Sequence, residues 1–178
     1  PAASLVAIVD PATEAVGLAA SLGAQHYDDY EQMLDEVVPD GVIVALPNTL
    51  HVDAGLACIA RGIPVLVEKP IADTVASAMR LVEAGEEADI PVLVGHHRRH
   101  GSDIREAKRA IESGELGRIV AINGIAAVAK HDTYFDADWR RLPGGGPLLI
   151  NAIHDIDCFR TLCGEIESVQ AIGSSAVR

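Results

Sequence analysis

Residues 65–74 read VLVEKPIADT, in which three apolar residues are followed by an acid, a base and a proline. The three apolar residues have the composition expected at the end of a buried strand. Glu68 and Lys69 therefore come where the strand ends, and Pro70 fixes the φ angle of the turn that carries them. We expect this turn to aim both charged side chains in a defined direction.

The first 118 residues alternate between short apolar segments and helical patterns. Strands are expected at 5–10, 41–46, 64–67 and 91–95, and helices at 11–22, 28–37, 49–61 and 74–88. Strands that are apolar throughout and separated by helices predict parallel βαβ units covered on both faces.

A second domain is expected to start near residue 118, where the pattern changes. Later elements are expected as a helix at 103–113, a loosely alternating, antiparallel-type strand at 118–128, a loop at 131–143, a helix at 148–162 and a strand from 168. We therefore predict one domain at 1–118 and the start of another at 119–178.

The composition indicates a water-soluble protein with an acidic surface. The 178 residues include 14 basic and 26 acidic ones, so the net charge is −12. This charge repels the phosphates of nucleic acid, which is not expected as a partner. The sequence has no transmembrane run, and its three cysteines form no CxxC pair. We also expect no signal peptide. These features favour a cytoplasmic protein with free thiols.

Polar residues follow each expected strand. The residues concerned are Asp10, then Pro47 and Asn48 with His51 close behind, then Glu68 and Lys69, then the run from His96 to Arg99. In a parallel sheet these strand ends share one edge, and open α/β folds bind ligands in the crevice beyond it. The sequence therefore predicts a small-molecule cleft.

Asp10 suggests which molecule binds there. An acid that ends the second strand of a Rossmann unit hydrogen-bonds the adenosine ribose of NAD and repels the additional phosphate of NADP. We therefore prefer NAD to NADP, with an ordinary helix cap as the alternative role for Asp10. The glycine-rich GxGxxG turn should lie roughly 20 residues before this acid, and the sequence contains no such motif. We expect the chain to lack the first strand and phosphate loop of the fold.

The ordered motifs EKP (68–70), GHHRR (95–99) and GGGPLLINAIHDID (144–157) resemble the Gfo/Idh/MocA family of NAD(P)-dependent oxidoreductases. This resemblance implies an incomplete Rossmann-type parallel sheet, followed by the start of an α/β domain with a mostly antiparallel sheet that forms dimers or tetramers. It also implies a cofactor site made of Asp10, Pro47, Asn48, His51, Glu68 and Lys69. Lys69 would lie by the nicotinamide and the substrate, and His154 would be the acid–base residue.

The implied chemistry is consistent with the residue types. A histidine can take the proton of a substrate hydroxyl near neutral pH, and a lysine can polarise the substrate oxygen. Many family members carry an aspartate four residues before the histidine, where this chain has Ile150. Asn151 can orient the imidazole or bind substrate without supplying charge, and Asp157 is another candidate partner.

The remaining polar residues leave alternatives open. Arg98 is expected to bind the substrate or to pair with an acid, and Trp139 is expected to line a sugar site or to pack between domains. His96 and His97 would point to opposite faces of an extended strand, and we expect no metal site.

We predict hydride transfer between NAD(P) and a sugar, polyol or related cyclic alcohol or ketone. The alternatives are an imine or enone reductase using the same cleft, and a non-catalytic nucleotide-binding regulator. The chain alone is expected to be weakly active or inactive, and the active protein is expected to be a homo-oligomer.

Overall fold

The computed structural model describes residues 3–127, 129–137, 140–141, 146 and 148–174. The chain forms two compact units. Unit 1 contains Pro1–Gly95 and Asp132–Gly146, and unit 2 contains His96–His131 and Pro147–Arg178. The domain boundary near residue 118 stays a prediction.

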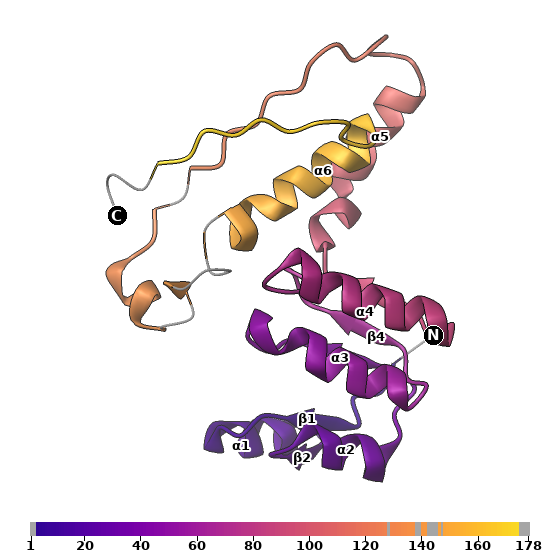
Figure 1. Ribbon diagram of the computed structural model, residues 1–178, viewed down its shortest axis with the longest axis vertical. Coiled ribbons are helices and arrows are strands. Elements are labelled where there is room, and N and C mark those ends of the chain that lie inside the picture. The colour runs from indigo at the N-terminus through magenta and orange to yellow at the C-terminus, as the bar shows by residue number, and fades with distance from the viewer. Residues whose placement is uncertain (1–2, 128, 138–139, 142–145, 147, 175–178) are drawn as a thin grey trace. The chain divides into compact units, whose positions relative to one another are not determined.

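Unit 1 contains short strands alternating with helices (Figure 1). The strands are β1 (Ala7–Val9), β2 (Gln25–Tyr27), β3 (Val42–Val44), β4 (Val65–Val67) and β5 (Val92–Val94). The helices are α1 (Thr13–Leu22), α2 (Tyr30–Val37), α3 (His51–Ala60) and α4 (Val75–Ala88), with short 3-10 turns η1 (Asn48–Leu50) and η3 (Asp132–Asp136).

The strands of unit 1 form two parallel sheets, which confirms the predicted parallel α/β architecture. One sheet pairs β1 with β2, and the other has the order β3-β4-β5. The sequence did not predict β2, whose residues are QHY rather than an apolar run.

Local signals set the helix ends of unit 1. Asp29 and Thr74 begin α2 and α4, since their side chains accept the backbone N–H of the residue three positions later. Gly23 ends α1 at a φ of 70°, a left-handed conformation that glycine adopts without steric cost. These ends direct the chain into the following strand or loop.

The core of unit 1 lies between the three-stranded sheet and the helices α3 and α4. Val65 and Val67 of β4 are buried there together with Cys58 and Leu81. The helices α3 and α4 run side by side (Figure 1) and contact each other. Burial raises the pKa of Cys58 to about 11, so this thiol is a core residue and not a nucleophile.

Unit 2 is built on two helices, α5 (Ser102–Glu112) and α6 (Ile153–Cys163), which contact each other. The short turns η2 (His97–His100) and η5 (Leu148–Ala152) both pack on α6. The helix predicted at 148–162 is present as a continuous helical segment, in which η5 has π-helical geometry and α6 continues from Ile153.

The prediction of a mostly antiparallel sheet is wrong for the residues that the structure describes, where all strand pairs are parallel. The described residues of 118–128 and 168–173 form no strand. Val120, Ile125 and Val169 have exposed side chains in these segments. A strand exists only when a partner accepts its backbone hydrogen bonds, and these extended segments lack such partners within the described chain.

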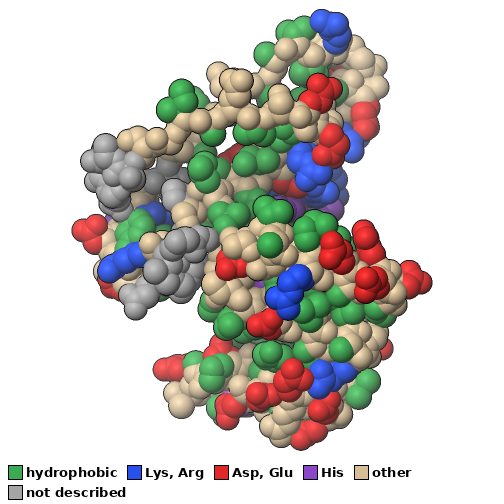
Figure 2. Space-filling model, in the orientation of Figure 1, with side chains coloured by type: hydrophobic (Ala, Val, Ile, Leu, Met, Phe, Trp, Pro, Cys, Tyr) green, Lys and Arg blue, Asp and Glu red, His purple; other side chains and the backbone are tan. Residues whose placement is uncertain are grey.

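The surface carries many acidic side chains among apolar ones (Figure 2).

No helix within the described ranges is long and apolar enough to cross a bilayer.

Candidate functional site

The carboxyl ends of β3, β4 and β5 lie at one edge of the larger sheet in unit 1. Val44, Val67 and Val94 are aligned across the three strands. The N–H of Glu68 donates to the Val44 carbonyl at 2.8 Å, and the N–H of Gly95 donates to the Val67 carbonyl at 2.8 Å. The residues that follow the strands therefore share this edge.

Glu68 and Lys69 form the turn that leaves β4. A carboxylate oxygen of Glu68, Oε2, accepts the backbone N–H of Lys69 at 3.2 Å. The other oxygen, Oε1, lies 2.9 Å from the position that a Cβ on Gly95 would occupy. The missing side chain at Gly95 thus leaves room for the Glu68 carboxylate beside the end of β5. Lys69 is half-buried, and Pro70 after it is buried.

Asn48 and His51 lie in the loop that leaves β3 and at the start of α3. Both are buried, whereas Pro47 before them is exposed. The Pro47 carbonyl accepts the N–H of Leu50 at 2.8 Å, which closes η1. The His51 ring contacts the backbone carbonyls of Leu46 and Pro70, which belong to two different loops.

Asp10 is exposed at the end of β1. Its Oδ1 accepts the N–H of Ala12 at 2.8 Å, so its side chain orders the turn into α1. Its backbone is tied to β2, because its N–H donates to the Tyr27 carbonyl at 3.0 Å and its carbonyl lies 2.9 Å from His26 Nε2. Asp10 therefore stabilises the turn between β1 and α1. Its binding of the cofactor ribose stays a prediction.

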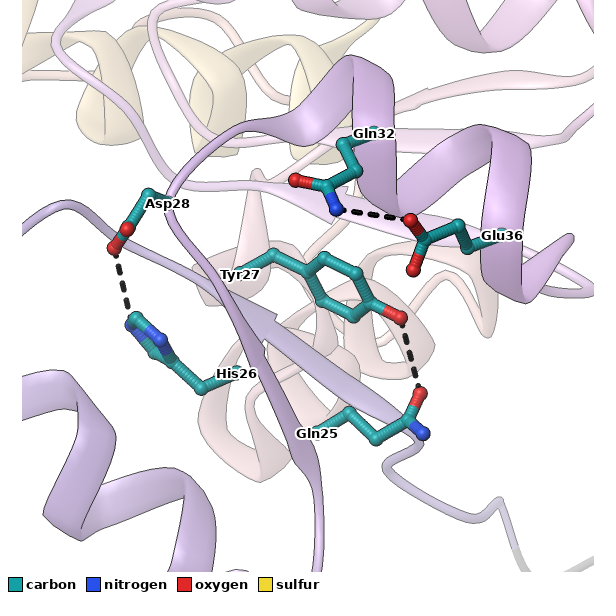
Figure 3. A pocket seen from close by; sticks show the side chains of 6 residues that line it. All are labelled: Gln25, His26, Tyr27, Asp28, Gln32 and Glu36. Atoms are coloured by element: carbon teal, nitrogen blue, oxygen red, sulfur yellow. Dashed lines mark hydrogen bonds and ion pairs between the residues drawn. The ribbon is translucent and has the colours of Figure 1, made fainter.

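A polar pocket of about 470 Å³ lies beside β2 and one face of α2. Figure 3 shows its lining residues, Gln25, His26, Tyr27, Asp28, Gln32 and Glu36. Burial and the nearby Glu36 raise the pKa of Tyr27, so its phenol stays protonated and donates to Gln25 Oε1 at 3.1 Å. The lining contains two carboxylates, and none of the residues predicted to bind cofactor or substrate belongs to it. The pocket adjoins Asp10, whose backbone contacts the lining residues His26 and Tyr27, and lies beside the smaller sheet rather than at the Glu68–Lys69 turn.

His154 lies in the first turn of α6 in unit 2 and is buried. Its ring meets two histidines of the segment that follows β5. The centroid distances are 4.6 Å to the His97 ring and 6.3 Å to the His96 ring, both with edge-to-face geometry. Sequence analysis did not predict this histidine cluster, because 57 or more positions separate the two segments in the chain.

Asp157 is buried one turn further along α6. Arg99 donates to its two carboxylate oxygens, with Nε 2.9 Å from Oδ2 and Nη2 on Oδ1. His96 Nδ1 lies 4.0 Å from Oδ1. Burial alone would raise the pKa of Asp157, but the Arg99 hydrogen bonds and the His96 charge outweigh burial and hold this pKa below its ordinary value. Asp157, weighed above as a partner of His154, therefore has Arg99 as its main partner.

Arg98 also pairs with α6, through a hydrogen bond from its Nη1 to Asp155 Oδ1 at 3.0 Å. The sequence predicted that Arg98 either binds substrate or pairs with an acid, and the structure shows the pairing with an acid. Ile150 and Asn151 lie in η5, immediately before α6. Substrate contacts by Arg98 and Asn151 stay predictions.

Trp139, predicted to bind substrate, lies outside the described residues. Near it in the sequence, Arg140 lies 4.1 Å from the Tyr134 ring centroid and donates to the Tyr134 carbonyl at 2.7 Å. Among the described residues, no group of three or more metal-binding side chains is close enough to hold a metal ion.

The predicted site residues thus fall into two groups. Unit 1 brings Asn48, His51, Glu68 and Lys69 into the loops at one sheet edge. Unit 2 places His154 of α6 beside His96 and His97 of the segment that follows β5.

Two family models match the chain. One describes the oxidoreductase family with an NAD-binding Rossmann fold and matches residues 1–96. The other describes the Gfo/Idh/MocA C-terminal domain and matches residues 104–178. The chain belongs to the Gfo/Idh/MocA oxidoreductase family. The family predicted from the sequence motifs is therefore confirmed.

Several Gfo/Idh/MocA proteins are similar to the chain. An inositol 2-dehydrogenase of Saccharopolyspora erythraea is 34% identical over 164 residues, which cover 90% of this chain and 46% of that enzyme. A 1,5-anhydro-D-fructose reductase of Ensifer adhaerens is 35% identical over 136 residues, covering 73% of this chain and 39% of that enzyme. The chain thus spans about half the length, or less, of these relatives.

Solved structures of the family show the same fold. The WlbA dehydrogenase from Bordetella pertussis, in complex with NADH and UDP-GlcNAcA, superimposes with a TM-score of 0.78 at 29% identity. The matched region covers 90% of this chain and 50% of that one.

Proposed function

We propose that this chain forms part of an oxidoreductase that transfers a hydride between NAD(P) and a sugar, polyol or related cyclic alcohol or ketone. The observation that carries the proposal is the Glu68–Lys69 turn, which lies at the carboxyl edge of a parallel sheet beside the loop of Asn48 and His51. Ligands of open α/β sheets bind at this edge. The inositol dehydrogenase and anhydrofructose reductase relatives support this substrate class.

The cofactor would bind along the sheet edge, on Asp10, Pro47, Asn48, Glu68 and Lys69. His51, which the sequence also placed at this site, is buried behind the loops and would act on the cofactor only through them. Asp10 is exposed at the end of β1, where a carboxylate suits the ribose hydroxyls of NAD and disfavours the phosphate of NADP. NAD is therefore the preferred cofactor, and the NADH complex of the Bordetella relative supports this preference.

The chemical step needs an electrophile at the substrate oxygen and a proton acceptor. Lys69 would polarise the oxygen, and His154 would accept the hydroxyl proton. NAD, when bound, would serve as the hydride acceptor. Arg98, Asn151 and Trp139 would contact the substrate. Arg98 suits a carboxylate or phosphate group and would have to release its exposed ion pair with Asp155 to bind one.

Substitution at the two catalytic positions tests this assignment. In the full-length protein, Lys69→Met and His154→Asn should each lower kcat for NAD-dependent oxidation of a polyol by about 100-fold or more. Lys108→Met is the matched control, since Lys108 pairs with Glu112 on the exposed face of α5, and it should retain activity. Full activity in either catalytic variant would overturn the assignment of that residue.

Two other functions use the same cleft. Reduction of an imine or enone would need the same hydride donor, and a panel of imines, enones and polyols separates the two enzyme classes. A non-catalytic nucleotide-binding regulator is favoured only by Ile150, at the position where the family resemblance implies an aspartate. Cofactor binding without turnover of any panel substrate would support the regulator.

The active protein is proposed to be a cytoplasmic homo-oligomer. Val120, Ile125 and Val169 expose apolar side chains on extended segments of unit 2, and a second copy of the chain would cover them. Light scattering of the full-length protein should therefore give the mass of a dimer or tetramer, and a monomer would contradict the proposal.

A further inference from the structure

The His51 side chain is almost completely buried, with 1% of its surface exposed. Its two ring nitrogens both face backbone carbonyl oxygens. Nδ1 lies 2.8 Å from the Pro70 carbonyl oxygen, and Nε2 lies 2.7 Å from the Leu46 carbonyl oxygen. Both distances are those of good hydrogen bonds.

A neutral imidazole cannot form both of these hydrogen bonds. It carries one N–H, so its second nitrogen would present a lone pair to the lone pairs of a carbonyl oxygen. A carbonyl cannot donate a proton, and no choice of tautomer removes this conflict. Only the doubly protonated imidazolium donates to both oxygens.

The two carbonyls belong to the loops that carry the proposed cofactor residues. Leu46 leads from β3 into the segment with Asn48, and Pro70 closes the turn of Glu68 and Lys69. The ring therefore connects two loops that leave neighbouring parallel strands.

We propose that His51 is a positioning residue, whose imidazolium clamps the loop after β3 to the Glu68–Lys69–Pro70 turn and so sets the geometry of the cofactor-binding edge. The clamp itself needs no cofactor. Its relevance to catalysis rests on the function proposed above.

Burial and the position at the N-terminus of α3 both oppose a positive charge on His51. Against them stand two short charge-assisted hydrogen bonds, which are stronger than neutral ones. The elements near His51 also carry charged residues. They are Asp53 on α3, Glu68 and Lys69 after β4, and Arg80 and Glu83 on α4. On α2, Glu31 and Asp35 both pair with Arg61. Within the described part of the chain, no carboxylate forms an ion pair with the His51 ring, so the two carbonyls are its main stabilising partners.

The protonation state is measured by NMR on the 178-residue chain at neutral pH. Long-range ¹H–¹⁵N correlations from the carbon-bound ring protons report both ring nitrogens without requiring the N–H protons to be retained. The imidazolium should give two similar nitrogen shifts, whereas a neutral ring gives two very different ones. The exposed His100 is the internal reference. A neutral pattern for His51 would overturn the imidazolium.

The clamp is tested by hydrogen exchange in His51→Leu, which removes both donors. Amide exchange should become at least tenfold faster in both loops, 45–50 and 68–72. The control is Leu81→Ala, which opens the core between α3 and α4 without changing either carbonyl contact and should accelerate exchange in those helices instead. His51→Gln, whose amide nitrogen has two donor protons, should restore part of the protection.

Unchanged exchange in either loop of His51→Leu would overturn the clamp, as would equal acceleration of the loops by Leu81→Ala. If His51→Leu does not fold, the ring-nitrogen measurement on the unaltered chain still decides the protonation state and His51→Gln tests the loops. None of these measurements involves NAD or a substrate. They therefore separate failure of the clamp from failure of the proposed hydride transfer.

Discussion

Asp157 carries a negative charge at a buried position of α6, held by Arg99 and near His96. The pKa of this carboxyl is lowered in the folded state. A lowered folded pKa means that the carboxylate stabilises the fold above the unfolded pKa of about 3.9, and that this stability is lost as the pH falls toward the folded pKa. The Arg99–Asp157 pair should therefore stabilise the folded state at neutral pH and lose this effect in strong acid.

Asp157→Asn should lower the free energy of unfolding at pH 7 by about 1–2 kcal/mol, because it leaves Arg99 without its charged partner. This range is at the low end for buried ion pairs, since Arg99 is 39% exposed and its charge is partly solvated. Urea unfolding measures the effect, and the difference from the unaltered chain should shrink as the pH falls below about 4.

Asp155→Asn is the matched control, because it breaks the neighbouring exposed pair with Arg98. Its cost should stay below about 0.5 kcal/mol. Equal costs for the two variants, or a cost of Asp157→Asn that persists unchanged in acid, would contradict a specific role for the buried pair.

The residue types of the candidate site could be predicted from the sequence, but several of their contacts could not. Glu68 and Lys69 were identifiable because a buried strand ends directly before them. The pairing of Arg99 with Asp157 joins residues 58 positions apart, and no local pattern encodes such a contact. Similarly, the buried hydrogen bonds of His51 depend on a turn 19 residues away.

Among the elements, those with a strong local pattern were predicted and those without it were missed. The strands β3, β4 and β5 consist of apolar β-branched and leucine residues, which favour a strand covered on both faces. In contrast, β2 has the sequence QHY at the edge of its sheet, where one-sided burial imposes no apolar run. The antiparallel strands expected after residue 118 depended on partners that the described chain does not provide.

The contact between α3 and α4 requires a residue without a side chain. A Cβ on Gly55 would lie 2.7 Å from Leu81 Cδ1, and Leu81 is fully buried, so its side chain would have to shift within the core. Gly55→Ala gains about 1 kcal/mol of helix propensity. Overpacking of a filled core costs typically about 1–3 kcal/mol, so the net effect should be destabilising by about 1 kcal/mol.

Thermal or urea unfolding of Gly55→Ala checks this expectation. Gly17→Ala on α1 is the matched control, because a Cβ there meets no atom within 4 Å. That variant should be neutral or more stable. A stabilised Gly55→Ala chain would mean that the two helices separate at little cost and that their contact does not define the core.

At the scale of the whole molecule, the strand order relates this chain to the complete Rossmann fold. The doubly wound fold has the order 3-2-1-4-5-6. The present sheets, β2-β1 and β3-β4-β5, correspond to 3-2 and 4-5-6 in that order. Strand 1 of the complete fold lies between these two blocks and leads into the phosphate loop.

The 178-residue chain by itself should therefore bind NADH weakly and show little or no polyol-dependent turnover. The phosphate loop supplies the backbone N–H groups at a helix N-terminus that hold the pyrophosphate of the cofactor, and no GxGxxG motif is present in this sequence. The first measurement is the intact mass, which should be near 18.7 kDa for this chain. NADH absorbance with a polyol panel then measures turnover, with the full-length protein as the positive control. Turnover by a protein of verified 18.7 kDa mass would contradict the prediction, because the sheet edge of unit 1 would then hold the cofactor without a phosphate loop.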